Sequence, residues 1–165
     1  MEKIDIVIIG AGIAGIASAY YLQENFPNIR FKILESRSSV GGTWDQMRFP
    51  GVRADNDMYT YGFSFDPWKG SIIGNGKEIR NYLNKVTDKF NIKKNILFDT
   101  EVRSLNWKNN KWVIKTDLKK FVSQYIICCT GSRDRKNPHL PKFKNEKIYK
   151  GKIIHTQAWG NTDIK

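Results

Sequence analysis

The sequence contains very little cysteine: 2 residues in 165, adjacent to each other at Cys128 and Cys129. Neighbouring residues on a β-strand point to opposite faces, so a disulfide between these two would be strained. We therefore expect two reduced, partly buried thiols in a reducing compartment, which favours a cytoplasmic protein. A disulfide framework is not expected, and no metal site is predicted.

Long apolar runs are also missing. No stretch approaches the length that a membrane-spanning helix requires. The first residues, MEKIDIVIIGAG, do not fit a signal peptide, because their apolar run is short and ends in a glycine turn. We expect no stable membrane insertion.

Negative charge is scarce in the second half of the chain, and the formal net charge is +12. Residues 1–75 hold 7 lysines and arginines against 8 acidic residues, whereas residues 76–165 hold 21 against 8. Such asymmetry can indicate a nucleic-acid or membrane-surface partner. The lysines are scattered among asparagine and isoleucine, however, so a solvated basic surface is the simpler interpretation. Nucleic acid is not the expected partner.

The first 35 residues predict a β-α-β unit. Residues 4–10 form a nearly continuous β-branched run, typical of a strand buried on both faces of a parallel sheet. Residues 12–26 carry a helical apolar stripe that ends at Pro27, and residues 30–35 predict a second strand. This order indicates an α/β fold of the Rossmann type.

Residues 36–75 show little periodicity and are rich in glycine and aromatic residues, a composition that indicates either function or disorder. The stretch MYTYGFSFDPW is too aromatic to remain disordered in water. A helix over 76–90 follows. Short strands are then predicted at 96–99, 101–107, 111–116 and 119–124, as a small antiparallel insertion, and a further central parallel strand at 125–131. From residue 132 the basic, proline-punctuated chain predicts a surface connection.

The motif GAGIAG lies directly between the first predicted strand and the first helix. Gly10 permits the tight turn, Gly12 lets the backbone approach a pyrophosphate, and Gly15 lets helix and strand pack closely. The helix N-terminus then offers free N–H groups to the phosphates. Glu35 follows the second strand, 20 positions after Gly15, where its carboxylate can accept from both ribose hydroxyls. Because it would also repel a 2′-phosphate, the motif favours FAD or NAD over NADP at this site.

The sequence after Glu35 favours FAD over NAD. An NAD-binding fold would continue with the next β-α element, but this chain enters the irregular stretch instead. The doublet Gly41-Gly42 allows close approach of the backbone to a ligand, and Trp44 could lie along a flat ring. An extended cofactor that crosses the sheet edge would need such a slot. A plain loop turn with a packed tryptophan remains an alternative.

Taken in order, GAGIAG, Glu35, GGTWDQMRFPGVRADNDMYTYGFSF and the terminal YKGKIIHTQAW resemble flavin-dependent monooxygenases of the Baeyer–Villiger type. This family lies within the flavin-containing monooxygenase superfamily. The middle stretch is most similar to its ethionamide-activating branch. The resemblance covers essentially the whole chain.

A linker fingerprint of the family, F-x-G-x-x-x-H-x-x-x-W-P, is matched by Tyr149, Gly151, His155 and Trp159, with Tyr149 in place of Phe and Gly160 in place of Pro. The resemblance therefore implies an FAD-binding domain over 1–148 and, over 149–165, the linker to an NADPH-binding domain. The family's second glycine motif is absent from this sequence. Its catalytic arginine and its last sheet segment would also lie beyond the chain end, so the fold is expected to be incomplete there and the catalytic residue is unknown.

The resemblance also implies roles for individual residues. Those assigned to FAD are Gly10, Gly12, Gly15 and Glu35 on the ADP half, Gly42, Thr43, Trp44 and Gln46 on the flavin side, Asp55 and Tyr61 beside the ring, Val102 at the adenine through its backbone, and Thr130 and Gly131 along the cofactor. Arg53, Ala54 and Asp55 would face the nicotinamide of NADPH. His155 would couple the two nucleotide domains. As alternatives, Asp55 could cap a turn and His155 could be an ordinary loop histidine.

The implied activity is the NADPH- and O2-dependent oxygenation of a small ketone, sulfide or amine by bound FAD. The flavin carries the redox chemistry, and the protein positions and shields it. Full turnover by this chain alone is not expected. The alternative function is a non-catalytic FAD-binding module or remnant that acts through a partner chain, including a second chain that completes the fold.

Overall fold

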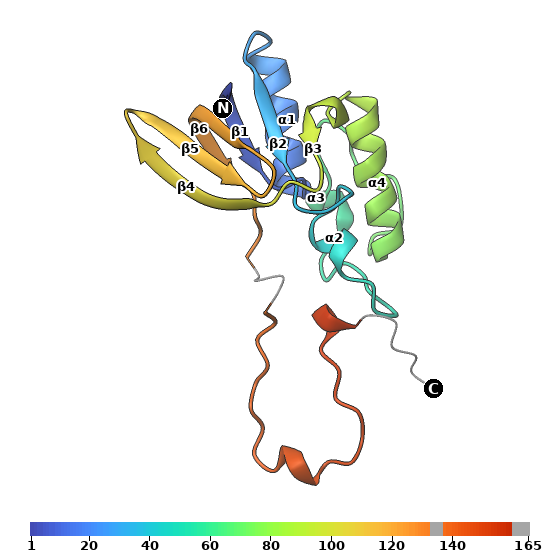
Figure 1. Cartoon of the computed structure of the whole chain (residues 1–165). Helices are drawn as coiled ribbons and strands as arrows, with labels where there is room; N and C mark the ends of the chain where they lie inside the picture. Colours follow the sequence, from blue (N-terminus) through green and yellow to red (C-terminus); the bar gives the residue numbers. More distant parts are fainter. Residues whose placement is uncertain (133–136, 160–165) are drawn as a thin grey trace.

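The computed structural model of the chain describes residues 1–132 and 137–159 (Figure 1). The helices and strands are β1 (Glu2–Ile9), α1 (Ile13–Asn25), β2 (Phe31–Leu34), α2 (Thr43–Gln46), α3 (Met58–Tyr61), α4 (Gly76–Lys89), η1 (Lys93–Asn95), β3 (Ile96–Leu97), β4 (Val102–Lys108), β5 (Lys111–Thr116), β6 (Lys120–Cys128), η2 (Glu146–Ile148) and η3 (Thr156–Ala158). Within these described ranges, no helix is both long and apolar enough to cross a membrane.

All six strands belong to one sheet with the order β3-β2-β1-β6-β5-β4. The pairs β3–β2, β2–β1 and β1–β6 are parallel, whereas β6–β5 and β5–β4 are antiparallel. In Figure 1 the antiparallel strands curve away from the parallel part. The predicted α/β fold, with its β-α-β start and small antiparallel insertion, is confirmed.

One part of the strand prediction was wrong. Residues 119–124 and 125–131 were expected to form two strands, but β6 runs without interruption through the boundary between them. Its first half pairs with β5, with Ser123 opposite Trp112, and β6 pairs with β1 from Phe121 to Cys128. The strand continues across residues 124 and 125 because β6 pairs with β1 on one side and with β5 on the other.

Alternate residues of β1 are buried on opposite faces of the sheet, which accounts for its continuous apolar run. Ile6 and Ile8 belong to a core that includes the apolar faces of α1 and α4. Val7 and Ile9 belong to a second core, which also contains Ile114 of β5 and Phe121 of β6. The antiparallel insertion therefore covers the face of the parallel sheet that the helices leave open.

The aromatic stretch after β2 is ordered. The ring of Phe65 stacks on Tyr20 of α1 with 3.6 Å between the ring centroids. The Tyr82 hydroxyl, on α4, donates to the carbonyl of Asp66 at 2.6 Å and accepts from the N–H of Phe63 at 2.8 Å. These contacts tie the stretch to both long helices, so the expectation of order over this region is confirmed.

Residues 137–159, here called the arm, leave the sheet after β6 and return toward α2 (Figure 1). At the returning end, the ring of Trp159 lies 6.2 Å from that of Phe49. Gly160, the last position of the linker fingerprint, lies outside the described residues. The exposed large apolar side chains of the arm are Leu140, Phe143, Ile148, Tyr149 and Ile153. The boundary between a domain ending at residue 148 and a linker from 149 stays a prediction.

Candidate functional site

The loop between β1 and α1 is held tightly against the ends of its neighbouring strands. Gly10 has φ +103, and a Cβ there would lie 2.4 Å from the carbonyl oxygen of Cys129. The Gly10 N–H donates to the carbonyl of Leu34 at 2.8 Å. A Cβ on Gly15 would lie 1.9 Å from the carbonyl oxygen of Gly10. These two positions require glycine because backbone occupies the space of a side chain.

Gly12 differs from these two glycines, because it has room for a side chain. It is the N-cap of α1 with φ −78, and a Cβ there would make an ordinary contact with the Gly42 Cα at 3.6 Å. No side chain caps the helix, and Gly12, Ile13 and Ala14 line a cavity. An uncapped helix N-terminus beside a cavity attracts an anion through its N–H groups and its partial positive charge.

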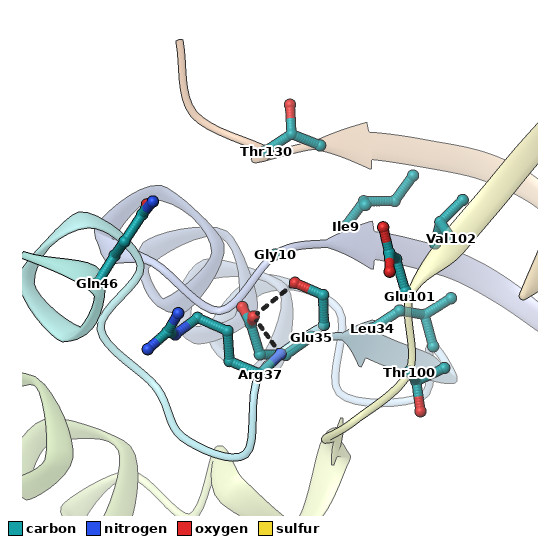
Figure 2. A pocket seen from close by; sticks show the side chains of 11 residues that line it. Ile9, Gly10, Leu34, Glu35, Arg37, Gln46, Thr100, Glu101, Val102 and Thr130 are labelled. Atoms are coloured by element: carbon teal, nitrogen blue, oxygen red, sulfur yellow. Dashed lines mark hydrogen bonds between the residues drawn. The ribbon is translucent and has the colours of Figure 1, made fainter. Parts of the chain in front are cut away.

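Glu35 connects this loop to the end of β2. Its side chain is fully buried. Its Oε2 accepts from the N–H of Ala11 at 2.7 Å. Its Oε1 accepts from the N–H of Arg37 at 2.9 Å and from the Ser36 hydroxyl at 3.3 Å (Figure 2). Its backbone carbonyl accepts from the N–H of Thr100 at 2.8 Å. The sequence predicted a ribose-binding carboxylate, whereas the structure adds a role in fixing the loop.

Two cavities adjoin along the carboxyl ends of the parallel strands. One, of about 440 Å³, lies between the end of β2 and the start of β4 (Figure 2). The other, of about 510 Å³, lies between α1, α2 and the end of β6. Gln46 and Thr130 line both. Together the cavities form an elongated slot at the edge where open α/β sheets bind their ligands.

The slot brings together most of the site residues that the sequence predicted. Those lining it are Gly10, Glu35 and Val102 in the 440 Å³ cavity, Gly12, Gly42, Thr43, Trp44, Tyr61 and Gly131 in the 510 Å³ cavity, and Gln46 and Thr130 in both. The indole N–H of Trp44 faces the Tyr61 hydroxyl at 3.5 Å, and their rings meet edge to face. GGTW leads into the one-turn helix α2, and Trp44 packs against the core that contains α1 and α4, so the alternative of a loop turn with a packed tryptophan stays open.

Other predicted residues lie apart from the slot. Ala54 is buried, with its N–H donating to the Gly74 carbonyl at 2.9 Å, and its neighbours in the chain are exposed. The helix α3 is capped by Asp57, which accepts from Thr60, rather than by Asp55. His155 is the N-cap of η3 and accepts from the Gln157 N–H at 3.1 Å.

The arm places the linker fingerprint outside the slot. Tyr149 and Gly151 are exposed, and His155 and Trp159 are half-buried. The capping contact of His155 supports its interpretation as a loop histidine with a local structural role. The function of these four residues in coupling two domains stays a prediction.

Sequence reasoning missed an ionic cluster beside the slot. The buried Asp45 of α2 accepts from Nε of Arg37 at 2.7 Å and also pairs with Arg48. Arg80 of α4 donates to the carbonyl of Trp44 at 3.4 Å. Arg37 lines the 440 Å³ cavity, so Asp45 holds the positively charged guanidinium group of Arg37 in place beside the slot. The aspartate within GGTWD could have pointed to this cluster from the sequence, but its pairing with Arg37 follows only from the fold.

Asp45 is expected to stabilise the protein in a pH-dependent way. Burial raises the pKa of its carboxyl, but the hydrogen bonds from Arg37 and Ser39 and the charges of Arg37 and Arg48 outweigh it, so the pKa lies below its usual range. A lowered pKa gives stability that is present above the unfolded value of about 4 and is lost as pH falls through the folded value. Asp45→Asn should therefore lower the free energy of unfolding by about 2 kcal/mol at pH 7.

The measurement is urea unfolding of wild type and Asp45→Asn at pH 7 and at pH 3. The difference between the two proteins should shrink at the lower pH. Asp88→Asn, at an exposed ion pair with Lys93, is the matched control and should change stability by less than about 1 kcal/mol. A difference for Asp45→Asn that does not depend on pH would contradict the assignment.

The two cysteines differ in their surroundings. Both are free thiols, and Cys128 is exposed whereas Cys129 is half-buried, with its Sγ 3.8 Å from the Ser18 Oγ. The expectation of two partly buried thiols was therefore wrong for Cys128, because its side of β6 is not covered by the described residues. Burial raises the pKa of the Cys129 thiol.

Cys128 should react first with a thiol reagent near pH 7.5. A raised pKa lowers the fraction of Cys129 present as the reactive thiolate, and burial also limits access of the reagent. A disulfide-exchange assay should show a fast phase that Cys128→Ser removes and Cys129→Ser retains. Equal rates for the two single variants would show that burial at Cys129 does not limit its reactivity.

The sheet order, the glycine loop and the slot define a Rossmann-like dinucleotide-binding domain. Residues 8–72 match a family described as NAD(P)-binding Rossmann-like domain. The chain is homologous to the amino-terminal third of FAD-containing monooxygenases, so the predicted resemblance is confirmed.

Three relatives illustrate this homology. A probable FAD-binding monooxygenase, AlmA of Acinetobacter baylyi, is 39% identical over 168 residues, covering 96% of this chain and 34% of the relative. The FAD-containing monooxygenase EthA of Mycobacterium tuberculosis is 38% identical over 165 residues, with the same coverage of 96% and 34%. The solved structure of an oxidized steroid monooxygenase bound to NADP aligns with a TM-score of 0.80 and 29% identity, over 96% of this chain and 32% of that one. The chain thus spans about a third of the length of these proteins.

Proposed function

We propose that the chain binds FAD in extended form along the slot. The observation that carries this proposal is the uncapped N-terminus of α1 at the 510 Å³ cavity, which adjoins the 440 Å³ cavity lined by Gly10 and Glu35. The pyrophosphate would lie at Gly12, and the ADP half would extend past Gly10 and Glu35 to Val102. The flavin would occupy the cavity lined by Gly42 and its neighbours in α2. The residues fit the cofactor, because Gly12 leaves space that no protein atom fills and the helix end lacks an acceptor.

We further propose that the chain is the FAD-binding part of an NADPH- and O2-dependent flavoprotein monooxygenase, acting in the cytoplasm on a small ketone, sulfide or amine. Bound FAD would supply the redox and oxygen chemistry. The chain's own residues would bind and orient it: Trp44 and Tyr61 wall the flavin cavity, and Glu35 holds the phosphate loop. The residues 53–55 would face NADPH, with the domain boundary at 148. Homology to FAD-containing monooxygenases supports this assignment.

A second candidate function is an FAD-binding module that acts through a partner chain. The exposed apolar side chains of the arm favour it, because several large apolar groups in one segment are typical of an interaction surface. This candidate shares the FAD site and differs only in what completes the enzyme. In both cases the isolated chain should bind FAD without oxidising NADPH.

The first test is a titration of the purified chain with FAD, followed by desalting and an absorbance spectrum. Wild type should retain flavin, and Gly12→Ala should weaken binding by about tenfold or more, since the added methyl group occupies the space for the pyrophosphate. Gly12→Ala should melt like wild type, because its Cβ meets only an ordinary contact. A folded wild-type chain that retains no flavin would falsify the proposal.

A further inference from the structure

A second carboxylate faces the slot, at the end away from the glycine loop. Glu101 precedes β4, and Figure 2 shows its side chain directed into the 440 Å³ cavity beside Val102. Its side chain is 31% exposed, so it is accessible to a ligand in the cavity. The sequence analysis assigned it no role.

The surroundings of Glu101 suit the edge of a flat ring. Ile9, Leu34 and Val102 provide apolar side chains around it (Figure 2). The Thr100 hydroxyl is directed elsewhere, since it donates to the carbonyl of Phe98 at 2.8 Å. An apolar wall with one strong acceptor at its edge binds a planar ring that carries a donor there.

Arg103 holds this acceptor in a fixed orientation. Its Nη1 lies 3.1 Å from Oε2 of Glu101, and its Nη2 lies 4.0 Å from Asp117. The N–H of Glu101 donates to Asp117 at 3.1 Å, which fixes the backbone at the same place. An ionised carboxylate has about four acceptor positions, so it can bind Arg103 and a ligand donor together.

We propose that Glu101 selects the base of the bound dinucleotide by accepting a hydrogen bond from the 6-amino group of adenine. This inference rests on the proposed function, which places the adenosine half of FAD in this cavity. A 6-oxopurine carries a carbonyl oxygen at the same position. That oxygen would face the carboxylate, and two acceptors without a donor between them repel each other. Glu101 therefore confers specificity for a 6-aminopurine dinucleotide over its 6-oxopurine counterpart.

The test compares FAD with its deaminated analogue, flavin hypoxanthine dinucleotide, by quenching of flavin fluorescence on the full chain. Wild type should bind FAD about tenfold more tightly, as expected for one hydrogen bond to a charged group. Glu101→Gln should bring the ratio close to one, because an amide offers an acceptor to adenine and a donor to hypoxanthine. Glu24→Gln, at an exposed position of α1, is the control and should keep the preference for FAD.

The outcomes separate this inference from the proposed function. Equal binding of the two dinucleotides by wild type, or an undiminished preference in Glu101→Gln, overturns the role of Glu101 while FAD binding stands. Binding of neither dinucleotide by the folded chain overturns the FAD site itself, and the inference with it.

Discussion

Replacement of Gly15 by alanine is expected to lower the free energy of unfolding by about 3 kcal/mol or more. The new Cβ would lie 1.9 Å from the carbonyl oxygen of Gly10, where no flexible side chain can move aside. The only relief is a shift of α1 away from the ends of β1 and β6, which opens the helix-side core. Urea unfolding followed by far-UV circular dichroism measures the loss.

Gly12→Ala provides the comparison within the same motif. Its Cβ would make an ordinary contact with the Cα of Gly42 at 3.6 Å, so its stability should stay within about 1 kcal/mol of wild type. The two substitutions should thus separate folding from binding: Gly15→Ala impairs folding, and Gly12→Ala impairs FAD retention. A stable Gly15→Ala protein would mean that the helix and strand are not packed as described.

Replacement of Glu35 by glutamine is expected to cost about 2–3 kcal/mol of stability and to weaken FAD binding as well. The buried carboxylate accepts from the N–H groups of Ala11 and Arg37 on opposite oxygens. An amide turns one of these acceptors into a donor, which leaves a backbone N–H buried without a partner. The contact between the glycine loop and the end of β2 would then be weakened.

The measurement for Glu35→Gln is urea unfolding, with FAD affinity determined on the folded fraction. Glu24→Gln, on the exposed side of α1, is the matched control and should leave both quantities unchanged. A Glu35→Gln protein with wild-type stability and weaker FAD binding would restrict Glu35 to the ribose role that the sequence predicts. Wild-type FAD affinity with reduced stability would restrict it to the loop.

Local patterns predicted the parts of the fold that depend on neighbouring residues. The β-branched run of β1 required burial on both faces, and the structure provides helices on one face and antiparallel strands on the other. The spacing of Gly10 and Gly15 predicted a tight turn and close packing, and both positions have backbone where a Cβ would be. These features follow from the sequence because a short segment contains their physical cause.

Contacts between distant segments were not predictable in the same way. The strand β6 was divided at a polar residue, because pairing with both β1 and β5 is invisible to a local pattern. The one-turn helices α2 and α3 are too short to show a period. The pairing of Asp45 with Arg37 depends on how the chain turns after β2.

The β-α-β start, the glycine loop and the resemblance to flavin monooxygenases could all be predicted from the sequence alone, because each depends on short contiguous stretches of residues. The tertiary structure was needed to show that Glu35 fixes the loop, that Cys128 is exposed, and that Glu101 lines the 440 Å³ cavity. Burial and hydrogen-bond partners depend on which segments meet across the sheet. Which segments come into contact depends on the whole fold, and no short stretch of sequence specifies it.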